Sequence, residues 1–198
     1  MLKAGITGGI GSGKSTICQV FETLGISVFY ADRAAKFLME KDPEITARIS
    51  ELFGEDVYTD GELQRERIAT LVFREPMLLD RLNNIIHPAV LKFGREWMES
   101  RKEPYVLKEA AIFFETGSYK EMDVMIGVYA PEKLRILRAA KRDNVSQDKI
   151  TNRISFQMND DEKMSRCDYV IVNDDTEPVL PQVLKIHEEL LKRAANGA

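Results

Sequence analysis

The chain has 198 residues, of which 44% are hydrophobic and 30% are charged, with a formal net charge of −4. A chain of this length folds as one domain, or as one core domain with appended lobes. The mild acidity disfavours a broad nucleic-acid-binding surface, so phosphate recognition must come from local cations and the substrate is expected to be small.

Cysteine usage and hydropathy predict a cytoplasmic protein. Cys18 and Cys167 are the only cysteines, and their separation fits neither a metal knuckle nor a disulfide framework. No apolar run approaches the roughly 18 residues of a membrane span, and the N-terminal residues lack a signal-peptide core. We therefore expect no membrane association.

The first elements form a strand, a glycine-rich loop and a helix. Residues 2–7 are compatible with a β-strand, and apolar residues recur at helical spacing from Ile17 until Gly25, a typical helix C-terminus. Residues 26–30 then predict a second strand that ends near Asp32.

From Asp32 to Pro104 the pattern is helical throughout. The expected segments are residues 33–40, 43–53, 63–73, 77–86 and 89–101, with turns or helix starts at Gly54, Asp60–Gly61, Pro76 and Pro88. A single crossover helix needs far fewer residues. The region is therefore expected to be a helical lobe inserted into an α/β core.

Strand patterns return at residues 105–108, 124–129 and 169–172, separated by helical segments. Short, nearly all-apolar strands that alternate with helices predict a parallel sheet covered on both faces. A last helix is expected over residues 176–195.

The stretch GITGGIGSGKST satisfies the phosphate-loop pattern GxxxxGK(S/T) through Gly8, Gly13, Lys14 and Ser15. Small residues let consecutive backbone N–H groups wrap a polyphosphate, and the following helix adds the positive end of its dipole. Lys14 would bridge the β and γ phosphates, and the Ser15 hydroxyl would ligate Mg²⁺. The loop predicts binding of a nucleoside triphosphate with Mg²⁺.

A phosphate loop does not by itself define the reaction, because motor ATPases, GTPase switches and small-molecule kinases share it. The sequence holds no NKxD stretch for reading guanine and no LSGGQ-type transporter signature. These absences favour a kinase that uses ATP.

Three carboxylates follow predicted strands, at the edge where doubly wound sheets collect their functional groups. Asp32 is placed either as a general base or as the N-cap of the next helix, and position alone does not separate the two. Glu109 and Glu115 could hold Mg²⁺ through water or contact the acceptor, although position alone favours solvated loop charges.

The segment EKLRILRAAKRD predicts a helix on which Arg135, Arg138 and Arg142 share a narrow arc. The other side would carry Leu134, Ile136, Leu137 and Ala140. Such a stripe either clamps phosphate oxygens, as a kinase lid does, or is a solvated basic face. The phosphate loop favours the clamp.

Several short stretches, taken in order, resemble the dephospho-CoA kinase family over nearly the whole chain. They are ITGGIGSGKST, VFYAD, IIHPAV, VLKEAAIFFE, RAAKRD, RISFQM with Lys163, and CDYVIVN. Asp32 falls on the second aspartate of the family's DAD segment, whose first aspartate is replaced by Tyr30. In the family's LDxPLLFE stretch, Glu109 stands for the aspartate and Ala111 for the proline, while Glu115 is retained.

The resemblance implies a P-loop kinase of the α/β class with three layers and a five-stranded parallel sheet. The core would cover about residues 1–31, 105–135 and 168–198, the helical acceptor-side lobe about 32–104, and the lid about 136–167 of one kinase domain.

The same resemblance implies the residues of the site. Asp32 would be the base, with Lys14, Arg138 and Arg142 acting on the transferred phosphoryl group. His87, Glu109 and Glu115 would join Asp32 on the acceptor side, although a lone His is more often a local hydrogen-bonding residue. The residues expected to bind the nucleotide are Gly8, Gly9, Gly11, Ser12, Gly13, Lys14, Ser15, Thr16 and Asn173.

The expected reaction is phosphorylation of the ribose 3′-hydroxyl of dephospho-CoA by ATP with Mg²⁺, which gives coenzyme A and ADP. Two alternatives are another small-molecule kinase of this fold, such as a nucleoside monophosphate kinase, and a nucleotide-dependent switch ATPase. We expect no nucleic-acid partner and no obligatory protein partner.

Overall fold

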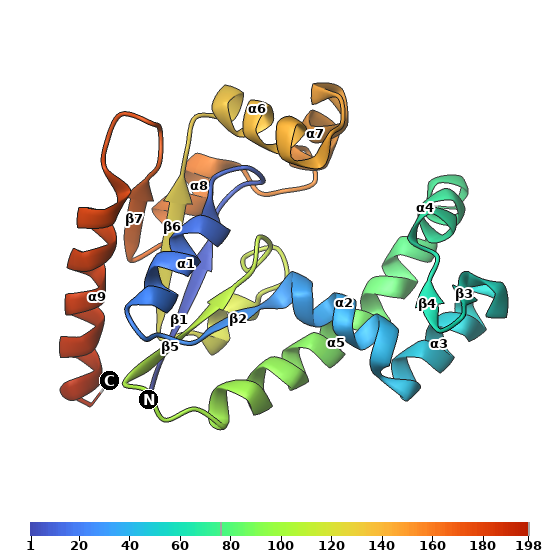
Figure 1. Ribbon diagram of the computed structural model, residues 1–198, viewed down its shortest axis with the longest axis horizontal. Coiled ribbons are helices and arrows are strands. Elements are labelled where there is room, and N and C mark those ends of the chain that lie inside the picture. The colour runs from blue at the N-terminus through green and yellow to red at the C-terminus, as the bar shows by residue number, and fades with distance from the viewer. Residues whose placement is uncertain (76, 198) are drawn as a thin grey trace. The chain divides into compact units, whose positions relative to one another are not determined.

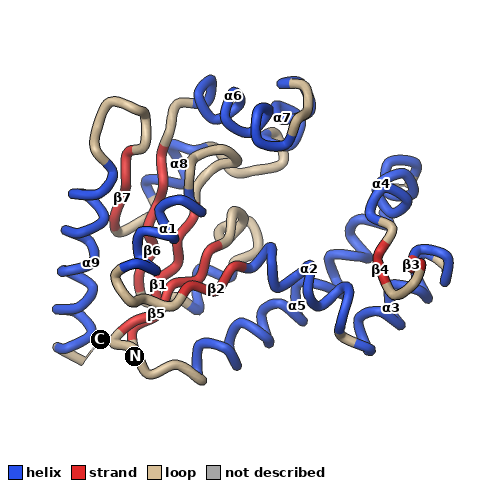
Figure 2. The backbone as a smooth tube through the Cα atoms, in the orientation of Figure 1, coloured by secondary structure: helices blue, strands red, loops and turns tan. Residues whose placement is uncertain are grey.

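The structure is a computed structural model that describes residues 1–75 and 77–197. Its contacts divide the chain into two units. The first unit consists of Met1–Tyr30 together with the chain from Ser100 onward, and the second is Ala31–Glu99. The first contains the main sheet, and the second is helical except for one short hairpin (Figures 1 and 2).

The main sheet of the first unit has five parallel strands in the order β2-β5-β1-β6-β7. They are β1 (Leu2–Thr7), β2 (Val28–Tyr30), β5 (Tyr105–Glu109), β6 (Val124–Tyr129) and β7 (Tyr169–Val172). The predicted α/β class and five-stranded parallel sheet are confirmed.

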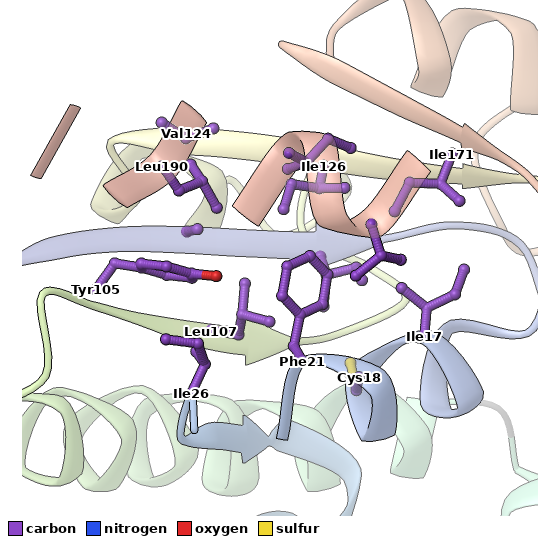
Figure 3. Packing of buried hydrophobic residues seen from close by; sticks show 14 of the residues in the cluster. Ile17, Cys18, Phe21, Ile26, Tyr105, Leu107, Val124, Ile126, Ile171 and Leu190 are labelled. Atoms are coloured by element: carbon purple, nitrogen blue, oxygen red, sulfur yellow. The ribbon is translucent and has the colours of Figure 1, made fainter. Parts of the chain in front are cut away.

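Two helices, α1 (Lys14–Thr23) and α9 (Val179–Ala195), pack on one face of this sheet. Phe21 of α1 and Leu190 of α9 join alternate strand residues such as Leu107 and Ile126 in one apolar core (Figure 3). On the opposite face, Met164 of α8 (Asp160–Ser165) packs against Gly127 of β6. Both faces are therefore covered, as the apolar strands predicted.

Helix α1 ends where Gly25 predicted. Gly25 adopts a left-handed conformation, with φ of 84°, and its N–H donates to Glu22 O. The N–H of Ile26 donates to Phe21 O, which completes a Schellman motif. The chain then turns back into β2, so the phosphate loop and β2 are joined by one short helix.

Three further helices and a short 3₁₀ turn complete the first unit. Helices α6 (Glu132–Asp143), α7 (Gln147–Ile154) and α8 follow one another between β6 and β7, and α6 packs against α7 (Figure 1). The 3₁₀ turn η2 (Ser118–Glu121) lies between β5 and β6.

The second unit is built on its longest helix, α5 (Met77–Glu99), which packs against α2 (Ala31–Lys41), α3 (Pro43–Phe53) and α4 (Arg65–Arg74). Asp42 caps α3 by accepting the N–H groups of Glu44 and Ile45, at 3.0 and 3.1 Å. The helical nature of this region agrees with its sequence pattern.

Three features of the second unit differ from the predictions, although the turn expected at Asp60–Gly61 is present. Asp60 and Gly61 form the turn of a hairpin, β3 (Tyr58–Thr59) and β4 (Glu62–Leu63), preceded by a 3₁₀ turn η1 (Glu55–Val57). Two-residue strands are too short for an alternation signal, and α4 starts at Arg65 rather than at Leu63. The prediction for Pro76 lies outside the described residues.

Pro88 was expected to mark a turn or a helix start between two helical segments, but it lies inside the continuous helix α5. A proline in a helix interior costs about 3 kcal/mol or more. Residues on both sides of it, including Ile85 and Val90, are buried on the packed side of α5. Packing of this face against α2 and α3 outweighs the cost, so tertiary contacts override the local preference.

Candidate active site

The glycine-rich loop follows β1, the central strand of the sheet. β5 and β2 lie to one side of β1, and β6 and β7 lie to the other, so the strand order reverses there. In open parallel sheets, ligands bind outside the carboxyl ends of the strands at such a switch point. The fold therefore places the loop where this class of sheet binds its ligands.

Lys14 holds the loop in its compact form. Its ammonium donates to the carbonyls of Gly8 and Gly9, at 2.9 and 3.3 Å, and lies 4.0 Å from Glu109 Oε1. Lys14 and Glu109 are both buried, at 9% and 6% exposure. Ile6 of β1 and Tyr30 of β2 flank Glu109 in the strand register, so this carboxylate lies at the predicted edge of the sheet.

Asn173, just after β7, contacts the loop directly. Its side-chain amide donates to Ser12 O at 2.8 Å, and its own carbonyl accepts a 2.9 Å hydrogen bond from Arg138. Arg138 also pairs with Asp175. The structure thus brings together two predicted residues, Asn173 and Arg138, beside the phosphate loop.

Two glycines of the loop are required by the neighbouring helix α6. A Cβ on Gly9 would collide with Nη1 of Arg135, and one on Gly11 would collide with the carbonyl oxygen of Arg135. Gly11 also has a φ of 80°, which side chains disfavour. Close packing of Arg135 therefore accounts for Gly9 and Gly11, whereas a Cβ on Gly8 would collide with the carbonyl oxygen of Val128.

The arginine pattern of α6 differs from the prediction. Arg135 is only 1% exposed, Ala139 is buried, and Leu137, expected on the opposite side from the arginines, is 54% exposed. The guanidinium of Arg135 is tolerated inside because it pairs with Asp160 and donates to the carbonyls of Ala130 and Ile10. Arg135 is therefore not part of an exposed stripe.

Arg142 lies near the end of α6, where its guanidinium donates to Asp143 Oδ1 at 2.7 Å. Arg153 of α7 reaches the other oxygen of the same carboxylate at 2.8 Å. These hydrogen bonds hold the pKa of Asp143 below its ordinary value, against the effect of its partial burial. Arg142 is exposed and belongs to the predicted lid segment.

Glu115 follows β5 in the loop before η2. One carboxylate oxygen accepts hydrogen bonds from Lys163 Nζ at 3.0 Å and from the N–H of Met158 at 2.8 Å. Lys163 is fully buried. In this structure the retained glutamate therefore links its loop to Met158, which lies between α7 and α8, and to Lys163 of α8.

Asp32 and His87 belong to the second unit. Asp32 is an exposed residue in the first turn of α2, two residues after the end of β2. The alternative of an N-cap is wrong, because α2 already begins at Ala31 and Asp32 lies inside the helix. His87 is half-buried in α5, and burial lowers its pKa below the ordinary value of 6.5. The imidazole is therefore mostly neutral at pH 7.

The remaining predicted residues belong to the loop and the start of α1. Gly8 and Ser12 are buried, whereas Gly13 is half-buried and Ser15 and Thr16 are exposed in the first turn of α1. Gly13 is the N-cap of α1 in a left-handed conformation, with φ of 93°. The Ser15 hydroxyl and the Glu109 carboxylate are hard oxygen donors of the kind that Mg²⁺ prefers, so the chemistry of these residues fits this ion.

Three residues that organise the site were absent from the predicted set. Gln157 accepts the N–H of Ile10 at 3.0 Å, Asp160 pairs with Arg135, and Lys163 pairs with Glu115. The RISFQM stretch was the sequence signal for Gln157 and the resemblance at Lys163 was the signal for that residue, whereas Asp160 had none. Their partners are distant in sequence, so local pattern analysis assigned them no role.

Comparison with known proteins identifies the family. The family model for dephospho-CoA kinase matches residues 2–178. The dephospho-CoA kinase of Bacteroides fragilis is 41% identical over 187 residues, covering 93% of this chain and 91% of the relative. That of Chlorobium luteolum is 40% identical over 202 residues, covering 98% of this chain and 92% of the relative.

Solved structures agree with the fold. A Thermus thermophilus protein superimposes with a TM-score of 0.82 at 30% identity, covering 97% of each chain. Dephospho-CoA kinase from Campylobacter jejuni has a TM-score of 0.71 at 24% identity, covering 96% of this chain and 98% of its own. Among the described residues, no helix combines the length and apolarity needed to cross a membrane. Over nearly its full length, the chain belongs to the dephospho-CoA kinase family.

Proposed function

We propose that the protein transfers the γ-phosphoryl group of ATP to the ribose 3′-hydroxyl of dephospho-CoA, which gives coenzyme A and ADP in the last step of coenzyme A biosynthesis. The observation that carries this proposal is the glycine-rich loop at the switch point of the sheet, in a chain that belongs to this family. We further propose that it acts in the cytoplasm, without nucleic acid or an obligatory protein partner.

On the donor side, the loop amides and the start of α1 would bind the triphosphate. Lys14 is already buried against the loop, and its ammonium would move from the Gly8 and Gly9 carbonyls to the β and γ phosphates. Ser12, Gly13 and Thr16 complete the proposed donor loop, and Asn173 would border the adenine.

The Ser15 hydroxyl would ligate Mg²⁺ directly, and Glu109 would hold it through water. The bound ion would neutralise charge that develops on the phosphate oxygens. Glu109 is suited to this role because it lies at the end of β5, 4.0 Å from the Lys14 ammonium.

On the acceptor side, Asp32 would orient the 3′-hydroxyl and accept its proton. The hydroxyl oxygen forms a bond to the γ-phosphorus while the bond from that phosphorus to the bridging oxygen of ADP breaks. Asp32 follows the carboxyl end of β2, which is the edge where parallel sheets bind ligands. His87 would donate or accept a hydrogen bond to the acceptor as a neutral imidazole.

The segment of residues 136–167 would act as the lid. Arg138 and Arg142 would close over the phosphates and exclude water, which would otherwise hydrolyse ATP. Glu115, whose carboxylate is bound to Lys163, would keep the acceptor-side loop in register with this segment.

The proposal is tested with a panel of acceptors. Purified protein with Mg-ATP receives dephospho-CoA, AMP, CMP, dTMP, adenosine or pantothenate, and ADP release is followed. We expect dephospho-CoA to stimulate ADP formation more than every other compound. A stronger response to AMP or CMP would instead identify a nucleoside monophosphate kinase, and turnover that responds to none of them would indicate a switch ATPase.

A further inference from the structure

In the phosphate loop, both backbone polar groups of Ile10 form hydrogen bonds with side chains from outside the loop. Its N–H donates to Gln157 Oε1 at 3.0 Å, and its carbonyl accepts from Arg135 Nη1 at 3.2 Å. Gln157 follows α7 and Arg135 lies in the first turns of α6. Two side chains from the region between β6 and β7 therefore fix the two peptide groups that flank Ile10.

Arg135 is itself rigidly held. Its guanidinium is almost fully buried, and its remaining nitrogens donate to Ala130 O at 3.1 Å and pair with Asp160 at the start of α8. Gly9 and Gly11 leave no space between the loop and Arg135. The guanidinium therefore cannot shift without moving the loop backbone.

Gln157 is held through its own backbone. Its N–H donates to Ile154 O at 2.8 Å, at the end of α7, and the N–H of the next residue, Met158, donates to Glu115. These two hydrogen bonds fix the backbone of Gln157 and Met158, and so they hold the Gln157 side chain next to the loop. The amide oxygen of Gln157 is therefore engaged by the Ile10 N–H.

We propose that Gln157 and Arg135 are positioning residues for the phosphate loop, which hold the Ile10 peptide groups so that the following amides can bind the nucleotide phosphates. This inference rests on the proposed function in taking the loop as the donor site. Since Gln157 lies in the predicted lid segment, its hydrogen bond also links the lid to the loop.

The test compares Gln157→Met with the matched control Asn159→Ala. Met has a similar length but lacks the amide oxygen. Asn159 lies two residues away and caps α8 by accepting the N–H groups of Asp161 and Glu162, so its loss removes hydrogen bonds that do not reach the loop. For each variant we would measure the Kd for ADP by calorimetry, the KM for ATP and for dephospho-CoA, and the Tm.

We expect Gln157→Met to raise the Kd for ADP and the KM for ATP about fivefold to tenfold, the effect of losing one hydrogen bond. The KM for dephospho-CoA should stay near the wild-type value, and the Tm should fall no more than in Asn159→Ala. Asn159→Ala should lower the Tm and leave ADP affinity unchanged. Wild-type ADP affinity in Gln157→Met, or an equal loss in the control, would overturn the inference.

Arg135→Lys provides a second variant. Lysine keeps the charge that pairs with Asp160 but cannot donate to Ile10 and Ala130 at the same time. We expect ADP affinity to fall at least as much as in Gln157→Met, and unchanged affinity would remove Arg135 from the proposal. ADP binding does not depend on the acceptor, so a wild type that ignores dephospho-CoA would refute the proposed function while leaving this result interpretable.

Discussion

The ammonium of Lys163 lies 3.0 Å from Glu115 Oε1 and 2.9 Å from the carbonyl of Ala111. These two groups belong to the loop after β5, whereas Lys163 comes from α8. The same carboxylate oxygen also accepts the N–H of Met158. One buried cation thus joins the predicted acceptor-side loop to the segment that contains Gln157.

Lys163→Met is expected to destabilise the protein by about 2–3 kcal/mol, because it leaves Glu115 and the Ala111 carbonyl without their buried partner. The value lies below that of a fully buried pair, since the Glu115 side chain is 22% exposed. Urea denaturation measures this loss in the free energy of unfolding. The matched control is Arg65→Ala, which removes an exposed pair with Glu40 and should cost less than about 1 kcal/mol. Equal stability of Lys163→Met and the wild type would contradict this assignment.

The same pair predicts a pH dependence of stability. Burial alone would raise the pKa of Glu115, but the hydrogen bonds from Met158 and Lys163 and the Lys163 charge hold it below the ordinary value of 4.5. The ionised carboxylate therefore stabilises the fold above pH 4.5, and this contribution is lost as the pH falls through the lower, folded-state pKa.

Comparison with Glu115→Gln isolates this contribution, since all other titrating groups are shared. The difference in free energy of unfolding between the wild type and this variant should be constant above about pH 5.5 and shrink as acid is added below the ordinary glutamate value. Denaturation curves of both proteins at a series of pH values measure this difference in the free energy of unfolding. A difference that grows on acidification would show that the pKa is raised instead.

Gly9→Ala is expected to impair nucleotide binding more than it impairs folding. The added Cβ would collide with Arg135 Nη1 and lie 2.8 Å from Asp160 Oδ1, so the loop must move away from α6. We expect a KM for ATP at least about tenfold above wild type, with a smaller change in the KM for dephospho-CoA. Steady-state kinetics with each substrate varied provides the measurement, and unchanged kinetics would mean that the loop and α6 separate freely.

Asp32→Asn tests the proposed base. Asparagine has nearly the same size and shape as aspartate, but it cannot accept the proton. If Asp32 is the base, kcat should fall by about 10²–10⁴ while ADP affinity and the Tm are retained. The matched control is Asp56→Asn, at an exposed carboxylate that pairs with Arg67. Full kcat in Asp32→Asn would exclude the proposed base.

The sequence alone determined those features that depend on neighbouring residues. The spacing of Gly8, Gly13, Lys14 and Ser15 defines a phosphate loop wherever it lies between a strand and a helix, and Gly25 ends a helix through its own conformation. The five apolar strand patterns, which also depend only on neighbouring residues, predicted a parallel sheet that is covered on both faces. Each of these signals is complete within a few residues of the chain.

Only the tertiary structure decided which distant groups meet. Ile10 and Gln157 are 147 residues apart, and Glu115 and Lys163 are 48 apart, so no local pattern could pair them. Helical periodicity placed Arg135 with the exposed arginines, but the partners that make its burial favourable, Asp160 and the Ile10 carbonyl, come from other elements. A charged side chain is tolerated inside a protein only where such partners are assembled by the fold.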